Sequence, residues 1–219
     1  MKLLREYIRT LLTEAALGVG DLDKKVVVIH DRGNIFDVTL HAKKIKGADV
    51  LAYYSEGSLG TIEAQKNFPR PGCGDAYKVR WAEAPKGWGP LLYDVAMEYA
   101  TMNGGGLTPD RTTVSPDAAG VWDYYLANRG DVEPHQLDDD EGLLTPEDKS
   151  DDCSMDAVYH RTKVFSIMDD MEESGDYTDE EIDNYWKDDL IKSALSKRYV
   201  SNGTPTINAL RAAGKLLEL

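Results

Sequence analysis

The stretch from Ala76 to Met102 limits the fold of this 219-residue chain more than any other part of its sequence. It opens with a strand-like run that ends at Ala82, and it closes with an apolar, helix-like run that begins at Pro90. A glycine-containing turn joins the two runs. Proline suits the first position of a helix, because the N–H that it lacks would have no partner there. The sequence therefore predicts a strand, a tight turn and a helix in succession.

Gly87 and Gly89 give this turn the outline of a phosphate cradle. Because glycine has no Cβ atom, a ligand can lie against the backbone. The first amides of a helix have no partner within the helix, and the helix dipole adds partial positive charge beside them. A plain strand-to-helix turn, in which glycines only permit close packing, is the alternative that the residues leave open.

The turn resembles the pyrophosphate-binding motif of the GCN5-related N-acetyltransferases, in which Gln or Arg, two residues, Gly, one residue and Gly or Ala precede an apolar helix. Gly87 and Gly89 match the two small positions, and Leu91 and Leu92 match the apolar start. Ala84 stands where the family usually has Gln or Arg, which is a departure from the pattern.

A second resemblance to this family follows downstream. The run from Val114 to Tyr125 is similar to the family's late strand and its Asn-x-x-Ala-x-x-Leu-Tyr helix. Ser115 stands at the Asn position, Ala118 at the Ala position and Trp122 at the Tyr position.

The resemblance implies an α/β (α+β) domain over residues 24–165, with a mixed, mostly antiparallel sheet flanked by helices. It also implies transfer of an acyl group, acetyl in the first place, from coenzyme A to an amine, with acetyl-CoA as co-substrate. The family holds this cofactor on strand backbone beside the turn and on the turn itself. The residues that the resemblance assigns to the cofactor are Val79, Trp81, Ala82, Lys86, Gly87, Trp88, Gly89, Leu91 and Leu92.

Acylation of an amine needs a polarised thioester carbonyl, a base for the amine proton and an acid for the leaving thiolate. Glu83, at the end of the strand, is the candidate base, directly or through water. The family's acid, a tyrosine, aligns with Trp122, which cannot donate a proton in acid catalysis. Tyr125, one helical turn further on, and its neighbour Tyr124 are the candidate acids. If these side chains only pack or face solvent, the protein is a catalytically inactive binding or structural protein on this fold.

Alternating strand and helix patterns surround the glycine turn. Before it, Val26–Ile29 and Ile35–Leu40 flank the turn residues 31–34 and predict a hairpin. The other elements predicted in this part are strands at 50–54, 77–81 and 107–114 and helices at 90–102 and 117–128.

Beyond Asp131 the chain becomes acidic and rich in turns, and 157–161 is predicted as a final strand. Residues 166–219 are interpreted as a helical extension. The helices predicted in this part of the chain are 164–171, 179–195 and 206–217. Residues 170–181 imitate the spacing of a calcium loop, but Thr178 followed by Glu181 is the signature of a capping box, which we favour.

Residues 1–20 predict an amphipathic N-terminal helix, with apolar side chains on one face. The run Leu12 to Glu14 resembles the hydrophobic-x-Glu cleavage signal of prohead proteases from large tailed bacteriophages, and the helix resembles the capsid-targeting segments of internal phage proteins. This resemblance implies a phage-encoded protein that is carried in the capsid interior. A helix that only docks on the core is the alternative.

The formal net charge of −14 argues against a general nucleic-acid binder, because nucleic acid would be repelled. No stretch resembles a signal peptide or a membrane span, so we expect no membrane partner and a cytoplasmic protein, in the host cytoplasm if a phage encodes it. In that reducing setting Cys73 and Cys153 are expected as thiols, with a disulfide as the less favoured alternative. Neither the cysteines nor the dispersed histidines predict a metal site, and the acceptor amine is not identified.

Overall fold

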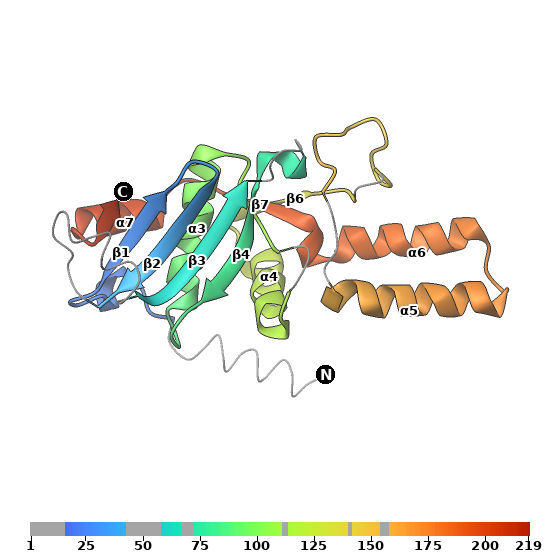
Figure 1. The fold of residues 1–219 in the computed structure, drawn as a ribbon, viewed down its shortest axis with the longest axis horizontal. Helices are drawn as coiled ribbons and strands as arrows, with labels where there is room; N and C mark the ends of the chain where they lie inside the picture. Colours follow the sequence, from blue (N-terminus) through green and yellow to red (C-terminus); the bar gives the residue numbers. More distant parts are fainter. Residues whose placement is uncertain (1–15, 43–57, 67–71, 111–113, 140–141, 154–157) are drawn as a thin grey trace.

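The computed structural model describes most of the chain (Figure 1). The described residues are 16–42, 58–66, 72–110, 114–139, 142–153 and 158–219. Residues 1–15, which hold most of the predicted N-terminal helix and its cleavage signal, lie outside these ranges, as does the predicted strand at 50–54.

The described residues form an eight-stranded sheet in the order β6-β7-β5-β4-β3-β2-β1-β8. The strands are β1 Val26–Asp31, β2 Ile35–His41, β3 Ser58–Lys66, β4 Tyr77–Glu83, β5 Leu107–Thr108, β6 Val132–Gln136, β7 Lys197–Ser201 and β8 Leu216–Glu218. Neighbouring strands are antiparallel, except that β8 is parallel to β1 and β5 is parallel to β4. The predicted mixed, mostly antiparallel sheet is therefore confirmed.

The hairpin predicted around residues 31–34 is also confirmed. Strand β1 pairs with β2 from Val26 opposite His41 to Asp31 opposite Phe36. Gly33 occupies the left-handed region at a φ of 83°, and its amide donates to the carboxylate of Asp31. Glycine adopts this conformation without steric cost, so it fits the turn that the strands require.

Five helices accompany the sheet in the described part of the chain. They are α3 Gly89–Asn103, α4 Pro116–Asn128, α5 Val158–Ser174, α6 Asp179–Lys192 and α7 Pro205–Ala212. Helix α3 runs along one face of the sheet (Figure 1). Its side chains Leu92 and Val95 share one buried core with Phe36, Val38 and Ile62 of the sheet. The helices predicted at 90–102 and 117–128 are confirmed as α3 and α4.

Three predicted elements need correction. The strand expected at 157–161 is wrong, because helix α5 begins at Val158. Of the strand expected at 107–114, only Leu107–Thr108 forms a strand among the described residues. The helix expected at 206–217 ends at Ala212, where Gly214 turns the chain at a φ of 62° into β8. Segment 166–219 therefore also contributes strands β7 and β8 to the sheet and is not helical throughout.

A long insertion separates strands β6 and β7, which are antiparallel neighbours. A turn of two residues can join such strands, whereas here residues 137–196 lie between them. The insertion starts with an acidic loop and continues into the hairpin of α5 and α6, residues 158–192, which we call the arm. The arm extends away from the sheet (Figure 1).

The base of the arm is fixed by the buried side chain of Lys197 on β7. Its ammonium group donates to the carbonyl of Ile191 at 2.7 Å and to the side-chain oxygen of Gln136. Gln136 in turn donates to the carbonyl of Leu190 at 3.2 Å. Because the last carbonyls of a helix lack partners and carry partial negative charge, a lysine there stabilises the end of α6.

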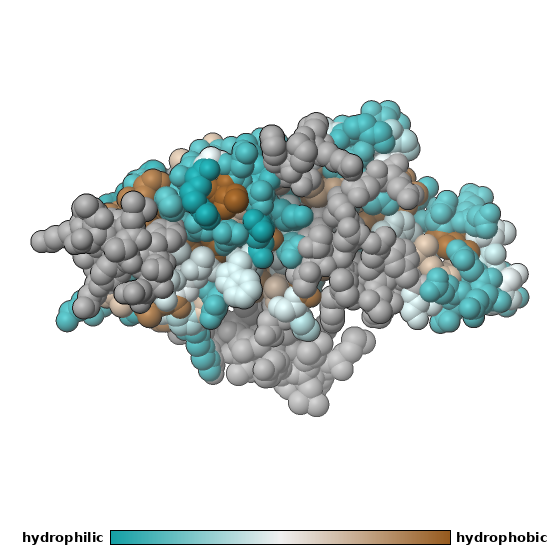
Figure 2. Space-filling model, viewed as in Figure 1, coloured by the Kyte–Doolittle hydropathy of each residue, from teal (hydrophilic) through white to brown (hydrophobic). Residues whose placement is uncertain are grey.

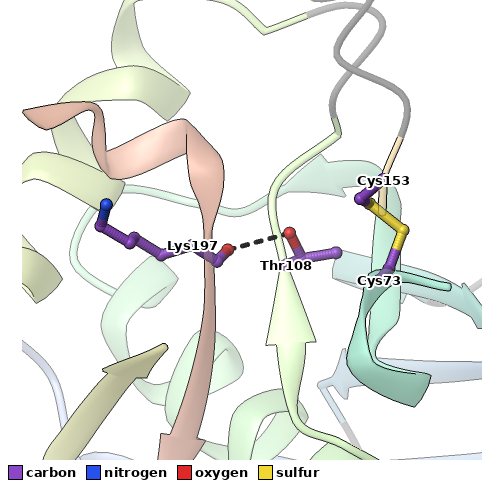
Figure 3. The surroundings of a disulfide bond; sticks show 4 residues. All are labelled: Cys73, Thr108, Cys153 and Lys197. Carbon is purple, nitrogen blue, oxygen red and sulfur yellow. Dashed lines mark hydrogen bonds between the residues drawn. A yellow bond between two sulfur atoms is a disulfide. The ribbon is translucent and has the colours of Figure 1, made fainter. Parts of the chain in front are cut away.

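Cys73 and Cys153 form a disulfide (Figure 3), so the expectation of two thiols is wrong. Both cysteines are buried together with Leu137. Backbone hydrogen bonds join the same two segments. The amide of Cys73 donates to the carbonyl of Asp152, and the amide of Cys153 donates to the carbonyl of Asp138. The disulfide therefore ties the acidic loop of the insertion to the turn that precedes β4.

The buried Asp138 organises that acidic loop. Its carboxylate accepts hydrogen bonds from the amides of Asp139, Leu144 and Thr145, each at 2.7 Å. Burial of a carboxylate is costly unless such donors surround it. The acidic, turn-rich segment after β6 therefore forms a hydrogen-bonded loop over its described residues.

The capping box predicted at the start of α6 is confirmed. The Thr178 hydroxyl accepts from the amide of Glu181, and the Glu181 carboxylate accepts from the amide of Thr178 at 2.8 Å. The first five positions of the alternative calcium loop, residues 170–174, belong to helix α5. Among the described residues, no helix combines the length and the apolar character that crossing a membrane requires.

Candidate cofactor site

Strands β4 and β5 separate at the point where β4 approaches the glycine turn. Over the described residues they pair at Tyr77 with Leu107 and at Lys78 with Thr108, and β4 continues to Glu83. The last four residues of β4 are all exposed. We call this end of the described β4–β5 pairing the splay; beyond it the exposed end of β4 lies beside the turn.

A β-bulge accompanies this splay. Trp81 lies opposite Glu63 of β3, whereas Val79 lies opposite the next residue, Ala64. Arg80 is thus the extra residue on β4, and such a bulge bends a strand and redirects its side chains. Trp81 is 60% exposed, which is unusual for so large an apolar side chain.

The start of the turn packs closely against the backbone of β3, whereas the region around Gly89 is open. Gly87 has a φ of 86°, a conformation that favours glycine. Gly60 of β3 lies so close that a Cβ atom there would meet the Glu83 carbonyl at 2.9 Å. Around Gly89, by contrast, the nearest described atom to an added Cβ would be that of the Ala84 side chain at 4.0 Å. The turn is tightly fixed on the β3 side and open in front of the helix.

The start of α3 has backbone donors to offer a ligand. Trp88, the residue before the helix, provides no side-chain cap. Its own amide donates to Pro85, and the amide of Leu92 donates to Trp88. In the described part of the chain, the amides of Gly89 and Leu91 donate to no protein acceptor. Together with the helix dipole, this arrangement suits an anion such as a phosphate.

These observations narrow the predicted set of cofactor residues. Val79, Trp88, Leu91 and Leu92 have buried side chains and belong to the core, so they can offer a ligand only their backbone. Exposed side chains at the site come from the other members of the set and from the candidate base. They are those of Trp81, Ala82, Glu83 and Lys86.

The candidate acid Tyr125 lies in a cluster of aromatic rings between α3, α4 and β7. It is 3% exposed, and its hydroxyl donates to Asp94 of α3 at 2.6 Å. Arg129 donates to the same carboxylate at 2.7 Å. Burial, and then the charge of Asp94, raise the pKa of the Tyr125 phenol well above its usual value. The phenol is therefore held as a neutral hydrogen-bond donor.

The neighbours of Tyr125 on α4 differ in exposure. Tyr124 is partly exposed, and its ring meets that of Tyr125 edge-on. Trp122, at the family's tyrosine position, is 1% exposed and stacks on Tyr199 of β7 with ring centroids 5.1 Å apart. Ser115 caps α4 by accepting from the amide of Ala118. Trp122 and Ser115 thus have structural roles.

The structure gives no contact, within its described residues, between Glu83 and either tyrosine. The sequence analysis also missed Asp94, which binds the Tyr125 hydroxyl. One signal could have found it, since Asp94 is an acidic residue between the apolar runs 91–93 and 95–97. Its partners, however, lie 31 and 35 residues further along the chain.

The chain matches no family model, no curated protein and no solved structure in the comparisons.

Proposed function

We propose that this protein binds acetyl-CoA and transfers its acetyl group to an amine, as an N-acyltransferase of the GCN5-related type. One observation carries the proposal: β4 splays from β5 and leads directly into an open glycine turn whose helix start offers the amides of Gly89 and Leu91. The splayed backbone suits the pantetheine arm, and the turn suits the pyrophosphate. Lys86, exposed on the turn, adds a point charge toward a phosphate.

The proposed reaction moves two protons. The amine attacks the thioester carbonyl, the carbon–sulfur bond breaks, and coenzyme A leaves as a thiolate. Glu83, exposed at the end of β4, takes the proton that the amine loses. Tyr124, which is partly exposed, or Tyr125 protonates the thiolate, and Tyr125 must first release its hydrogen bond to Asp94.

A second candidate function is binding of coenzyme A without catalysis. The position of Tyr125 favours it, because its hydroxyl is buried and engaged by Asp94. Trp122 at the position of the family's acid favours it as well. Carriage inside a phage capsid and a cytoplasmic location are compatible with both functions and remain proposals, and the Cys73–Cys153 disulfide is the feature that a reducing cytoplasm disfavours.

The experiment measures the unfolding midpoint of the full chain with and without acetyl-CoA, since a ligand that binds only the native state raises it. Gly89→Glu places a carboxylate in the cradle without a backbone clash, because the space there is open. Gly120→Glu, in α4, is the matched control, since nothing lies within 4 Å of a Cβ atom there. We expect acetyl-CoA to raise the midpoint of the parent and of Gly120→Glu but not of Gly89→Glu.

An absent shift in the parent, or an equal shift in both variants, would refute the cradle. Release of free thiol from acetyl-CoA in the presence of a panel of amines then separates the two candidate functions. Turnover that depends on Glu83 supports the transferase, whereas binding without turnover on any amine supports the inactive binder.

A further inference from the structure

The outer part of the arm, residues 166–192, carries a dense negative charge. From residue 166 to 192 the sequence has eleven Asp and Glu against two Lys, a net charge of −9 within a total of −14. All residues from 172 to 181 are exposed. Near the base of α6, Lys192 forms an ion pair with Asp188. The outer end of the arm is thus a concentrated field of negative charge.

At the end of α5 this charge lowers the stability of the arm, although the acidic first turn of α6 suits its own helix dipole. The last six residues of α5 include four acidic side chains, and its last turn contains no basic one. Acidic groups at the C-terminus of a helix oppose the helix dipole and lower its stability. The acidic first turn of α6 follows only a few residues later, so like charges gather at the tip. Such an arrangement is stabilised by a positively charged partner.

An apolar hollow lies within the acidic field. It has a volume of about 670 Å³, and its apolar and aromatic lining comes from Met171, Tyr177, Tyr185 and Ile191. The polar part of its lining comes from Glu181, Asn184, Lys187 and Asp188. Tyr177 is 50% exposed and Ile191 is 54% exposed. Figure 2 shows brown and tan surface on the arm surrounded by teal. Methionine and tyrosine are enriched in the cores of protein interfaces, where polar groups form the rim.

We propose that the arm is a docking surface for a basic polypeptide segment that carries apolar side chains between its lysines or arginines. The apolar side chains fill the hollow, and the basic ones meet the acidic groups around it, which gives charge complementarity. Because Lys197 fixes the base of α6 to the sheet, the surface is presented on an anchored support. The proposal is independent of the acyltransferase proposal.

The test is a fluorescence anisotropy titration of the full chain with a labelled helical peptide made of Lys and Leu at amphipathic spacing. Asp170→Asn/Glu172→Gln/Glu173→Gln removes three charges from the end of α5. These changes reduce the opposition to the helix dipole, so the variant should fold at least as well as the parent. We expect about a tenfold loss of affinity, as three exposed ion pairs predict.

Asp23→Asn/Glu133→Gln/Glu147→Gln is the matched control, since it removes three exposed charges outside the arm. Its affinity should stay within about twofold of the parent. Equal losses in the two variants would show that only total charge matters and would overturn the proposal.

The hollow is tested separately with Tyr177→Ser/Ile191→Ser, which should also weaken the Lys/Leu peptide. A peptide of Lys and Gly, which has no leucines, should bind the parent more weakly than the Lys/Leu peptide does. It should bind Tyr177→Ser/Ile191→Ser as tightly as it binds the parent. If the Lys/Gly peptide or spermine binds as tightly as the Lys/Leu peptide, the surface attracts cations only and the docking proposal is wrong.

Discussion

Helices α3 and α6 have nearly the same length, 15 and 14 residues, but very different surroundings. Nine side chains of α3 are buried, whereas two side chains of α6 are buried. Helix α3 has no side-chain cap, while α6 has a complete capping box and the pair Lys192 to Asp188. Burial thus stabilises α3, and local interactions stabilise α6, as expected when a helix has little packing to support it.

This difference predicts two kinds of unfolding. The sheet and α3 share one core, so they should open only with the whole protein. Helix α6 of the arm buries only Ile182 and Leu190, and the tip is exposed; such regions open locally at a lower free energy. A change at the link between the regions or in the core should therefore have a large, global effect, and a change on the arm should have a small, local one.

The largest effect is expected at the disulfide, which links the insertion to the sheet. The variant Cys73→Ala/Cys153→Ala should lose about 4 kcal/mol of unfolding free energy, because the bond closes a loop across 80 residues. Denaturant unfolding with tryptophan fluorescence measures this loss. The parent in reductant should unfold like the variant. If reductant left the unfolding free energy of the parent unchanged, the disulfide would contribute nothing to stability.

A smaller loss of global unfolding free energy is expected when Glu98, a buried carboxylate within α3, is replaced. It accepts hydrogen bonds from the amides of Thr206 and Ile207 at the start of α7, each at 2.8 Å. Thr204, at the capping position of α7, supplies no side-chain hydrogen bond of its own. Glu98→Ala leaves the buried amide of Ile207 and the partly buried amide of Thr206 without an acceptor, and it should lower the unfolding free energy by about 3 kcal/mol.

Two further variants sharpen this measurement by denaturant unfolding. Glu98→Gln keeps one acceptor oxygen and should lose about half as much. Glu133→Ala, an exposed change on the edge strand β6, should stay within about 0.5 kcal/mol of the parent. If Glu98→Ala behaved like this surface control, the carboxylate would not be the cap of α7.

The sequence predicted the elements whose determinants are local. Alternating β-branched residues and the Asp31 turn marked the hairpin, and the Thr178 signature marked the start of α6. Strands β6 and β7 were missed because their sequences, with Pro134 and Lys197 among them, are polar and short. They become strands through pairing with each other.

The same distinction between local and long-range determinants applies to the candidate site and to the contacts that fix the fold. The glycine turn could be predicted from the sequence because its conformation depends on residues that are adjacent in the chain. The disulfide could not, since its cysteines lie 80 residues apart and meet only in the folded chain. The partners of Asp94 and Glu98 are likewise distant, so no local pattern shows that Tyr125 is engaged or that Glu98 caps another helix.

The smallest effect is expected at the capping box of α6, and it should depend on pH. The hydrogen bond from the Thr178 amide, and then that from its hydroxyl, lower the pKa of the exposed Glu181 carboxyl. A carboxyl whose pKa is lower in the folded state stabilises the helix above its unfolded pKa, and this contribution disappears as the pH falls through the folded pKa. The first turn of α6 should therefore fray as the pH falls below about 4.

Backbone chemical shifts of α6 followed by NMR from neutral to acidic pH measure this fraying directly. In Glu181→Gln the additional fraying at low pH should vanish, because the variant has no carboxyl to protonate at that position. The global unfolding midpoint at neutral pH should barely change in this variant, since α6 is not part of the core of the sheet. A global loss as large as that of Glu98→Ala would mean that the arm and the sheet unfold together, and the distinction drawn between them would fail.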